Sequence, residues 1–143
     1  MAAVATVYSI EHPVRSAESI IGIEAKDSSP KPRARNKRVW EVGQRAPHEV
    51  TEEVFAEALR RDPERQRPWV MSVDGHEGQR GHIHTGIERH GVEVTLILGF
   101  IHVLEYLWKA AECFHAPGSE AAEPWVGERA LQILKGKPKE PHP

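Results

Sequence analysis

The sequence predicts an α/β protein in which helices alternate with parallel strands from residue 47 onward. Two short apolar runs, WVMSV at 69–73 and VEVTLIL at 92–98, have the length of strands buried on both faces. Segments with helical spacing of apolar residues precede, separate and follow these runs, and such alternation implies α/β layering. The length of 143 residues fits one domain or a substantial piece of one.

Composition narrows the class of protein. The net charge of −2 argues against a general nucleic-acid coat but leaves room for a local basic patch. The single cysteine, Cys113, rules out an intrachain disulfide and indicates a reducing, cytoplasmic setting. We expect no signal peptide, because the first ten residues are short of the required pattern and uncharged. The most apolar stretch, 92–111, contains charged residues, so we expect no membrane span.

Residues 1–46 are predicted to form one strand and a basic, proline-rich linker. Alternate residues of the segment 2–10 share one side, as in a strand: Val4, Thr6, Tyr8 and Ile10. Between 26 and 38, serines and prolines break regular structure, and six basic residues accompany one acid. The ordinary interpretation is a solvated linker. The functional interpretation is an arm that contacts phosphates through Arg33, Arg35, Lys37 and Arg38.

Four helices are predicted in the remainder of the chain. The first, at 47–61, carries one apolar stripe made of Val50, Val54, Ala58 and Leu59. The second, at 76–90, contains three glycines, each of which weakens it by up to about 1 kcal/mol relative to alanine. The third and fourth are expected at 101–114 and 119–135, and 137–143 is expected to be a disordered polar tail.

Asp74 is the strongest candidate for a catalytic or metal-binding residue. It follows the predicted strand 69–73 directly and precedes Gly75. A carboxylate in this position sits at the carboxyl edge of a sheet, where α/β proteins place ligands and metals. The alternative is a turn-forming aspartate that caps the next helix.

The nine histidines do not predict a zinc site. His82 and His84 are two residues apart, as are Cys113 and His115, and neither spacing is that of zinc ligands. Residues two apart on a helix point to different sides of it, so surface histidines are the better interpretation. We expect Cys113 to be a core or semi-buried thiol.

His102 differs from the other histidines because it opens a helix directly after the predicted strand 92–98. It would share a sheet edge with Asp74 if the two strands were parallel neighbours. The alternative is a helix-start histidine bonded to a backbone carbonyl.

Several segments resemble one family of proteins. They are VMSVDG, GVEVTLILGFIHVLEYLWKAAECFH and EPWVGERALQILKGK, together with MAAVATVY, KPRARNKRVW and EEVFAEALRRDPE nearer the N-terminus. In these segments the chain resembles the ISKra-type insertion-sequence transposases over nearly its whole length. The block FIHVLEYLWKAA is long and idiosyncratic, which makes the resemblance specific.

This resemblance implies an incomplete RNase H-like core of the DDE transposase type over residues 47–136, with a mixed sheet and flanking helices. In these enzymes three acidic residues hold two divalent metals, Mg²⁺ or Mn²⁺, for in-line attack on a DNA phosphodiester. The resemblance makes Asp74 the second acid, a catalytic metal ligand at the end of the fourth strand. It matches His102 with the histidine of the family's block, and it implies the ends of an insertion element as DNA partner.

Departures from the family pattern predict that the chain is inactive alone. The first acid is expected upstream of MAAVATVY and the third downstream of ILKGK, and Gly99 stands where the family block has aspartate. We therefore expect an internal transposase fragment that binds metal weakly. The alternative is a small DNA-binding or regulatory protein derived from a transposase, which associates with itself or with the full-length enzyme.

Overall fold

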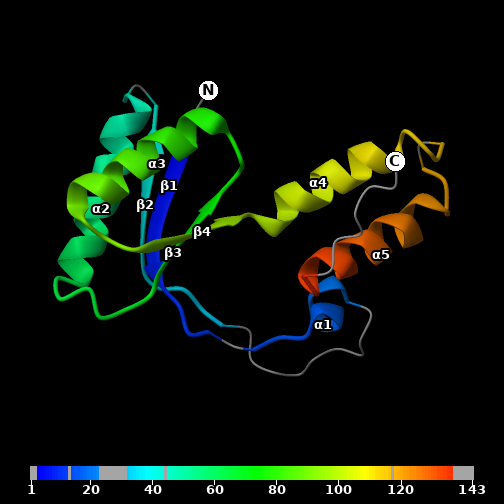
Figure 1. The fold of residues 1–143 in the computed structure, drawn as a ribbon, viewed down its shortest axis with the longest axis horizontal. Helices are drawn as coiled ribbons and strands as arrows, with labels where there is room; N and C mark the ends of the chain where they lie inside the picture. Colours follow the sequence, from blue (N-terminus) through cyan, green and yellow to red (C-terminus); the bar gives the residue numbers. More distant parts are fainter. Residues whose placement is uncertain (1–2, 13, 23–31, 44, 117, 137–143) are drawn as a thin grey trace. The chain divides into compact units, whose positions relative to one another are not determined.

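The computed structural model describes residues 3–12, 14–22, 32–43, 45–116 and 118–136. In these ranges the chain is a mixed α/β protein with two small sheets and five helices (Figure 1). It divides into two compact units. Unit 1 comprises Met1–Glu11 and Pro32–Leu98, and unit 2 comprises His12–Lys31 and Gly99–Pro143. The predicted polar tail at 137–143 lies outside the described residues.

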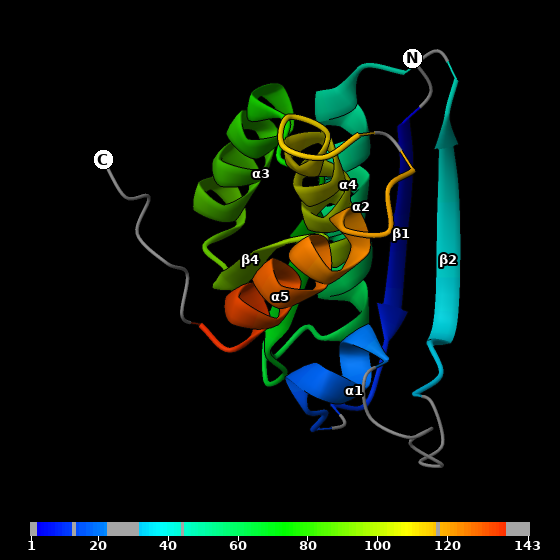
Figure 2. The same ribbon diagram turned by 90° about the vertical axis from the view of Figure 1, so that its right-hand side faces the viewer.

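The first sheet of unit 1 is an antiparallel pair, β1 (Ala3–Ser9) and β2 (Arg35–Val42). Figure 2 shows the two strands side by side with opposite directions. The predicted strand at 2–10 is confirmed. Residues 35–42 form a strand where the sequence pattern favours a linker, because β1 supplies backbone partners and Val39 and Trp40 suit a strand.

The second sheet is a parallel pair, β3 (Trp69–Val73) and β4 (Val94–Leu98), joined through α3 (Glu77–His90). Both strands and their parallel order are confirmed, although β4 begins at Val94, two residues later than predicted. Burial on both faces is wrong, because burial alternates along β3, and Val70 and Ile97 on the outer face are 50% and 45% exposed. A short apolar run cannot by itself distinguish a strand covered on one face from one covered on two.

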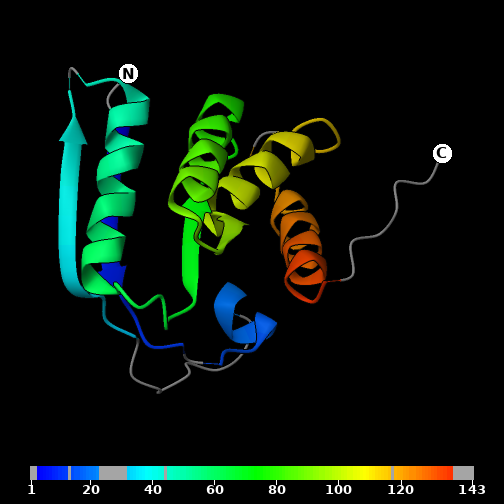
Figure 3. The same cartoon turned by 60° about the vertical axis from the view of Figure 1, so that its left-hand side comes forward.

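Helix α2 (Pro47–Arg61) packs beside α3 and against β1 (Figure 3). Its Phe55 is the most deeply buried large side chain and forms a core with Val73, Ile83 and Val92. The predicted helix is confirmed, but the predicted stripe omits Phe55. The ring lies so close to α3 that a Cβ at Gly86 would be 2.4 Å from Phe55 Cε2. The absence of a side chain at that glycine therefore permits the approach of the two helices.

Unit 2 contains α1 (Ala17–Ile21), α4 (Phe100–Ala111) and α5 (Ala122–Leu134). Its core is formed by Ala111, Ala122 and Val126, with partly buried leucines of α4 packed around them. An ion pair between Glu18 and Lys135 joins α1 to the end of α5. Cys113 is exposed, so the expectation of a core or semi-buried thiol is wrong. None of the helices in the described ranges is long and apolar enough to cross a membrane.

Candidate nucleic-acid interface

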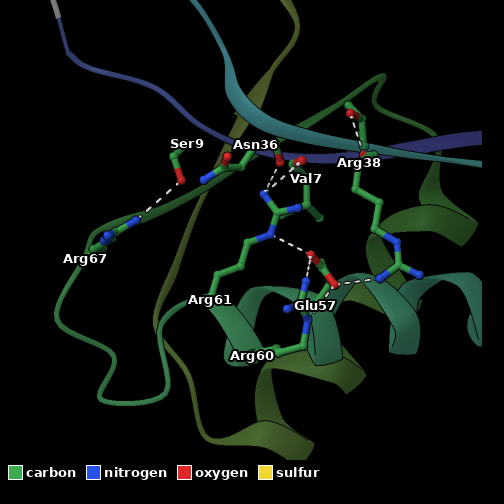
Figure 4. Close-up of polar contacts among 9 residues, drawn as sticks. Val7, Ser9, Asn36, Arg38, Glu57, Arg60, Arg61 and Arg67 are labelled. Atoms are coloured by element: carbon green, nitrogen blue, oxygen red, sulfur yellow. Dashed lines mark hydrogen bonds and ion pairs between the residues drawn. The ribbon is translucent and has the colours of Figure 1, made fainter.

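A buried carboxylate gathers three arginine side chains where α2 meets β2 (Figure 4). The side chain of Glu57 is only 3% exposed. Its Oε2 accepts hydrogen bonds from Arg38 Nη1 at 2.8 Å and Arg60 Nε at 3.1 Å. Its Oε1 accepts from Arg60 Nη2 at 2.7 Å and Arg61 Nε at 2.6 Å. These four bonds compensate the carboxylate for the loss of water.

The local sequence explains how the cluster forms. Arg60 and Arg61 stand three and four residues after Glu57, so the three side chains meet on one face of α2. Arg38 comes from the opposite element, because its strand position pairs with Val7 and directs it toward the helix. Arg61 Nη1 also donates to the Val7 carbonyl at 3.4 Å and to the Asn36 carbonyl. The helix is thereby bonded to both strands of the hairpin.

The charges of the cluster are strongly coupled. Hydrogen bonds from Arg60, then Arg61 and Arg38, lower the pKa of Glu57 from 4.5 to about 2, against the opposing effect of its burial. The same contact raises the pKa of Arg60. Three guanidinium groups against one carboxylate leave a local excess of positive charge. The surface here is therefore basic although the whole chain carries a net negative charge.

Beside the cluster runs an open groove of about 330 Å³. It is lined by Arg38, Trp40, Glu53, Ala56, Glu57 and Arg60. The side chains of Arg38 and Arg60 are 54% and 68% exposed, so both guanidinium groups reach solvent. Arg38 lies 4.8 Å over the ring of Trp40, a cation–π contact. Glu53, the other acid of the groove, is paired with Arg45 at 2.7 Å. The groove thus presents the planar guanidinium groups of Arg38 and Arg60, which are held in place by Glu57 and, for Arg38, by the Trp40 ring.

The residues predicted as a phosphate-contacting arm lie on β2 or just before it. Arg33 and Lys37 are exposed and make no ion pair within the described part of the chain. Arg35 pairs with Glu11 at 3.0 Å, and Arg38 belongs to the Glu57 cluster. Because neighbouring strand residues point to opposite faces, Lys37 and Arg38 do not share one surface.

The sequence analysis missed Trp40, Glu57 and Arg60. The signal was present in the acidic residue followed at three and four positions by two arginines. That spacing is also typical of an ordinary solvated helix end, so the sequence alone does not reveal the burial of Glu57.

The two residues predicted as catalytic belong to different units. Asp74 is exposed at the end of β3, and its Oδ1 accepts from the backbone N–H of His76 at 3.0 Å, as in a turn before a helix. His102 lies in the first turn of α4 with Nδ1 3.2 Å from Glu105 Oε2. The bond from His76 to Asp74 is the one expected for the turn-forming alternative. Asp74 is also exposed to solvent.

The described residues do not fit the two-metal centre of a DDE enzyme. Nowhere in the described ranges do three His, Cys, Asp or Glu side chains converge as a metal site. Asp74 alone offers one carboxylate, whereas Mg²⁺ sites use further carboxylates or phosphates. No catalytic step through a metal follows from this arrangement.

Comparisons with known proteins do not assign the chain to a family. No protein family, curated protein or solved structure matches it significantly. The resemblance to ISKra-type transposases therefore stays a prediction.

Proposed function

We propose that this chain binds nucleic acid through the surface formed by β2 and α2, as a DNA-binding part of a transposase-type protein. The observation that carries the proposal is the arginine cluster, in which Arg38 and Arg60 stand exposed at an open groove. A guanidinium group offers several N–H donors in a plane, which match the oxygens of a phosphate group. Phosphate contacts of this kind supply most sequence-independent affinity for DNA.

The charge distribution along β2 supports the same surface. Four basic residues occur between 33 and 38, and no acidic residue lies between 32 and 40. Arg33 and Lys37 add exposed charge outside the groove. A duplex or single strand beside β2 would meet Arg38 on the face toward α2, with the charges of Arg33 and Lys37 nearby.

The transposase-type origin rests on the sequence resemblance, which the two sheets do not test. In an RNase H-like sheet the first strand lies between the second and the fourth. β1 and β3 correspond to those two strands in the resemblance, and in the described part of the chain β1 pairs with β2 and β3 pairs with β4. Asp74 follows β3, as the resemblance implies for the second acid. Cleavage of DNA is no part of the proposal, since two metals require further acids.

A salt series tests the proposed function. Binding of a fluorescent duplex of about 20 base pairs is measured by anisotropy at increasing salt. We expect the R38A/R60A variant, in which Arg61 still bonds Glu57, to bind more weakly and to reduce the slope of log K against log salt by up to about 2, one for each lost phosphate contact.

The matched control is R80A/K109A, which removes the same charge from exposed positions outside β2. Its slope should stay near that of the unaltered protein. Two outcomes would overturn the proposal: no binding at low salt, or equal slopes for the two double variants.

A further inference from the structure

We propose that the groove between β2 and α2 is a site for a backbone phosphodiester group, and that Glu57 is the positioning residue of this site although its own charge repels phosphate. The inference rests on the proposed function and deepens it. The group contacted is a backbone phosphodiester. The buried carboxylate of Glu57 orients the arginines that bind this group.

The hydrogen bonds leave donors for such a ligand. Of the five N–H donors on each guanidinium, Glu57 takes one from Arg38 through Nη1 and two from Arg60 through Nε and Nη2. The other donors of both arginines make no bond within the described part of the chain. Both side chains line the same groove. A phosphodiester oxygen in the groove is therefore within the reach of two separate arginines, one from each element.

Glu57 makes the site rigid before any ligand binds. An exposed arginine normally samples many rotamers, and ordering it on binding costs entropy. Here the carboxylate is 3% exposed and holds both guanidinium groups by bonds of 2.7–3.1 Å. The Trp40 ring supports Arg38 from a second direction at 4.8 Å. The entropic cost of ordering the two arginines is therefore incurred on folding and not on binding.

Glu53 provides the contrast that separates positioning from charge. It lines the same groove and carries the same charge, but its partner is Arg45 and neither Arg38 nor Arg60. If charge alone mattered, removal of either acid would tighten binding of a polyanion. If Glu57 positions the arginines, E53Q tightens binding slightly and E57Q weakens it.

The experiment measures anisotropy of the same labelled duplex at one low salt concentration for both variants. We expect E57Q to weaken binding by about tenfold, by analogy with the lower end of the loss when a residue that orients a metal ligand is removed. We expect E53Q to bind as tightly as the unaltered protein or more tightly. Equal tightening by E57Q and E53Q would overturn the positioning role.

A second variant keeps the test decisive if E57Q is poorly folded, which circular dichroism reports. R60K retains the positive charge and loses the planar fork that bonds Glu57 at two points. It should weaken duplex binding nearly as much as E57Q. Unchanged binding by folded R60K would overturn the proposal by itself.

Two further measurements distinguish a free phosphate from a nucleic-acid phosphate as the ligand. They also separate a failure of this inference from a failure of the proposed function. Titration with inorganic phosphate, followed by the arginine Nε–H NMR signals of Arg38 and Arg60, should give weak shifts that the duplex reproduces at far lower concentration. Shifts with phosphate but none with the duplex would assign the groove to a free phosphate and overturn the inference. Absence of any duplex binding by the unaltered protein would instead defeat the proposed function itself.

Discussion

The two sheets of unit 1 are attached to the same helix by opposite kinds of chemistry. The β3–β4 pair meets α2 through Phe55, which is 1% exposed in an apolar core. The β1–β2 pair meets it through Glu57, which is 3% exposed among arginines. Residues two apart on a helix point in nearly opposite directions, so neighbouring positions serve different faces. One helix can therefore join a region held by apolar burial to a region held by charge.

The largest expected effect comes from breaking the apolar attachment. Phe55→Ala should reduce the free energy of unfolding by about 3–5 kcal/mol, because the core collapses only partly around the lost ring. Chemical denaturation followed by tryptophan fluorescence measures this, since Trp40 and Trp69 lie in the two sheets of unit 1. A loss below about 1 kcal/mol would contradict the central place given to this ring.

A smaller effect should follow from separating the two helices. Gly86→Ala places a Cβ against the Phe55 ring and should cost about 1–3 kcal/mol, despite the better helix propensity of alanine. Gly81→Ala is the matched control, because nothing lies within 4 Å of its Cβ position. That variant should be neutral or stabilised by up to about 1 kcal/mol. Equal effects of the two substitutions would exclude a close approach at residue 86.

The contact of α2 with the β1–β2 pair, which depends on Glu57, should lose stability in acid. The apolar contact through Phe55 should not. The folded-state pKa of Glu57 is about 2 against an ordinary 4.5. Its contribution to stability is therefore complete above about pH 4.5 and is lost as pH falls toward 2. Asp62, whose pKa is lowered chiefly by the bond from Trp69, adds a loss of the same sign.

Comparison with E57Q isolates the Glu57 part of this acid sensitivity. Thermal melts between pH 6 and 2 should show a shrinking difference in stability between the unaltered protein and E57Q. A difference that stays constant over this range would show that the carboxylate is not stabilised by its arginines.

The smallest effect is expected on the outer face of β3. Val70→Thr should change the free energy of unfolding by no more than about 0.5 kcal/mol, since Val70 is half exposed. Val73→Thr makes the same change on the inner face, where the side chain is 8% exposed, and should cost about 1–3 kcal/mol by burying a hydroxyl. Similar costs at both positions would restore the expectation of a strand buried on two faces.

The sequence predicted the elements of unit 1 well where apolar spacing was strong. The helix at 47–61 and the strand at 69–73 have the predicted bounds. The strand β2 was not predicted, because its basic residues follow a proline-rich segment and much of its stability comes from pairing with β1. Long-range pairing of this kind leaves little local signal.

Less of the candidate site could be predicted. Arg33, Arg35, Lys37 and Arg38 were found by their charge, but the partners that order Arg38 lie on α2. Glu57 stands in a charged stretch of sequence that is typical of an exposed helix face. The packing of α2 against the β1–β2 pair is what buries its side chain. The roles of Asp74 and His102 stay predictions, since among the described residues neither belongs to a group of three possible metal ligands.

The order of the chain through the two units has a consequence for folding. The partners in β1 and β2 are joined through His12–Lys31, which belongs to unit 2, and α1 contacts α5 across more than half the sequence. Closing such long loops costs entropy that grows with the logarithm of their length. Once either unit forms, it shortens the loop that the other must close. The interleaved path therefore couples the folding of two units with separate cores. A single cut between Leu98 and Gly99 leaves all of unit 1 on one fragment, whereas no single cut leaves all of unit 2 on a fragment of its own.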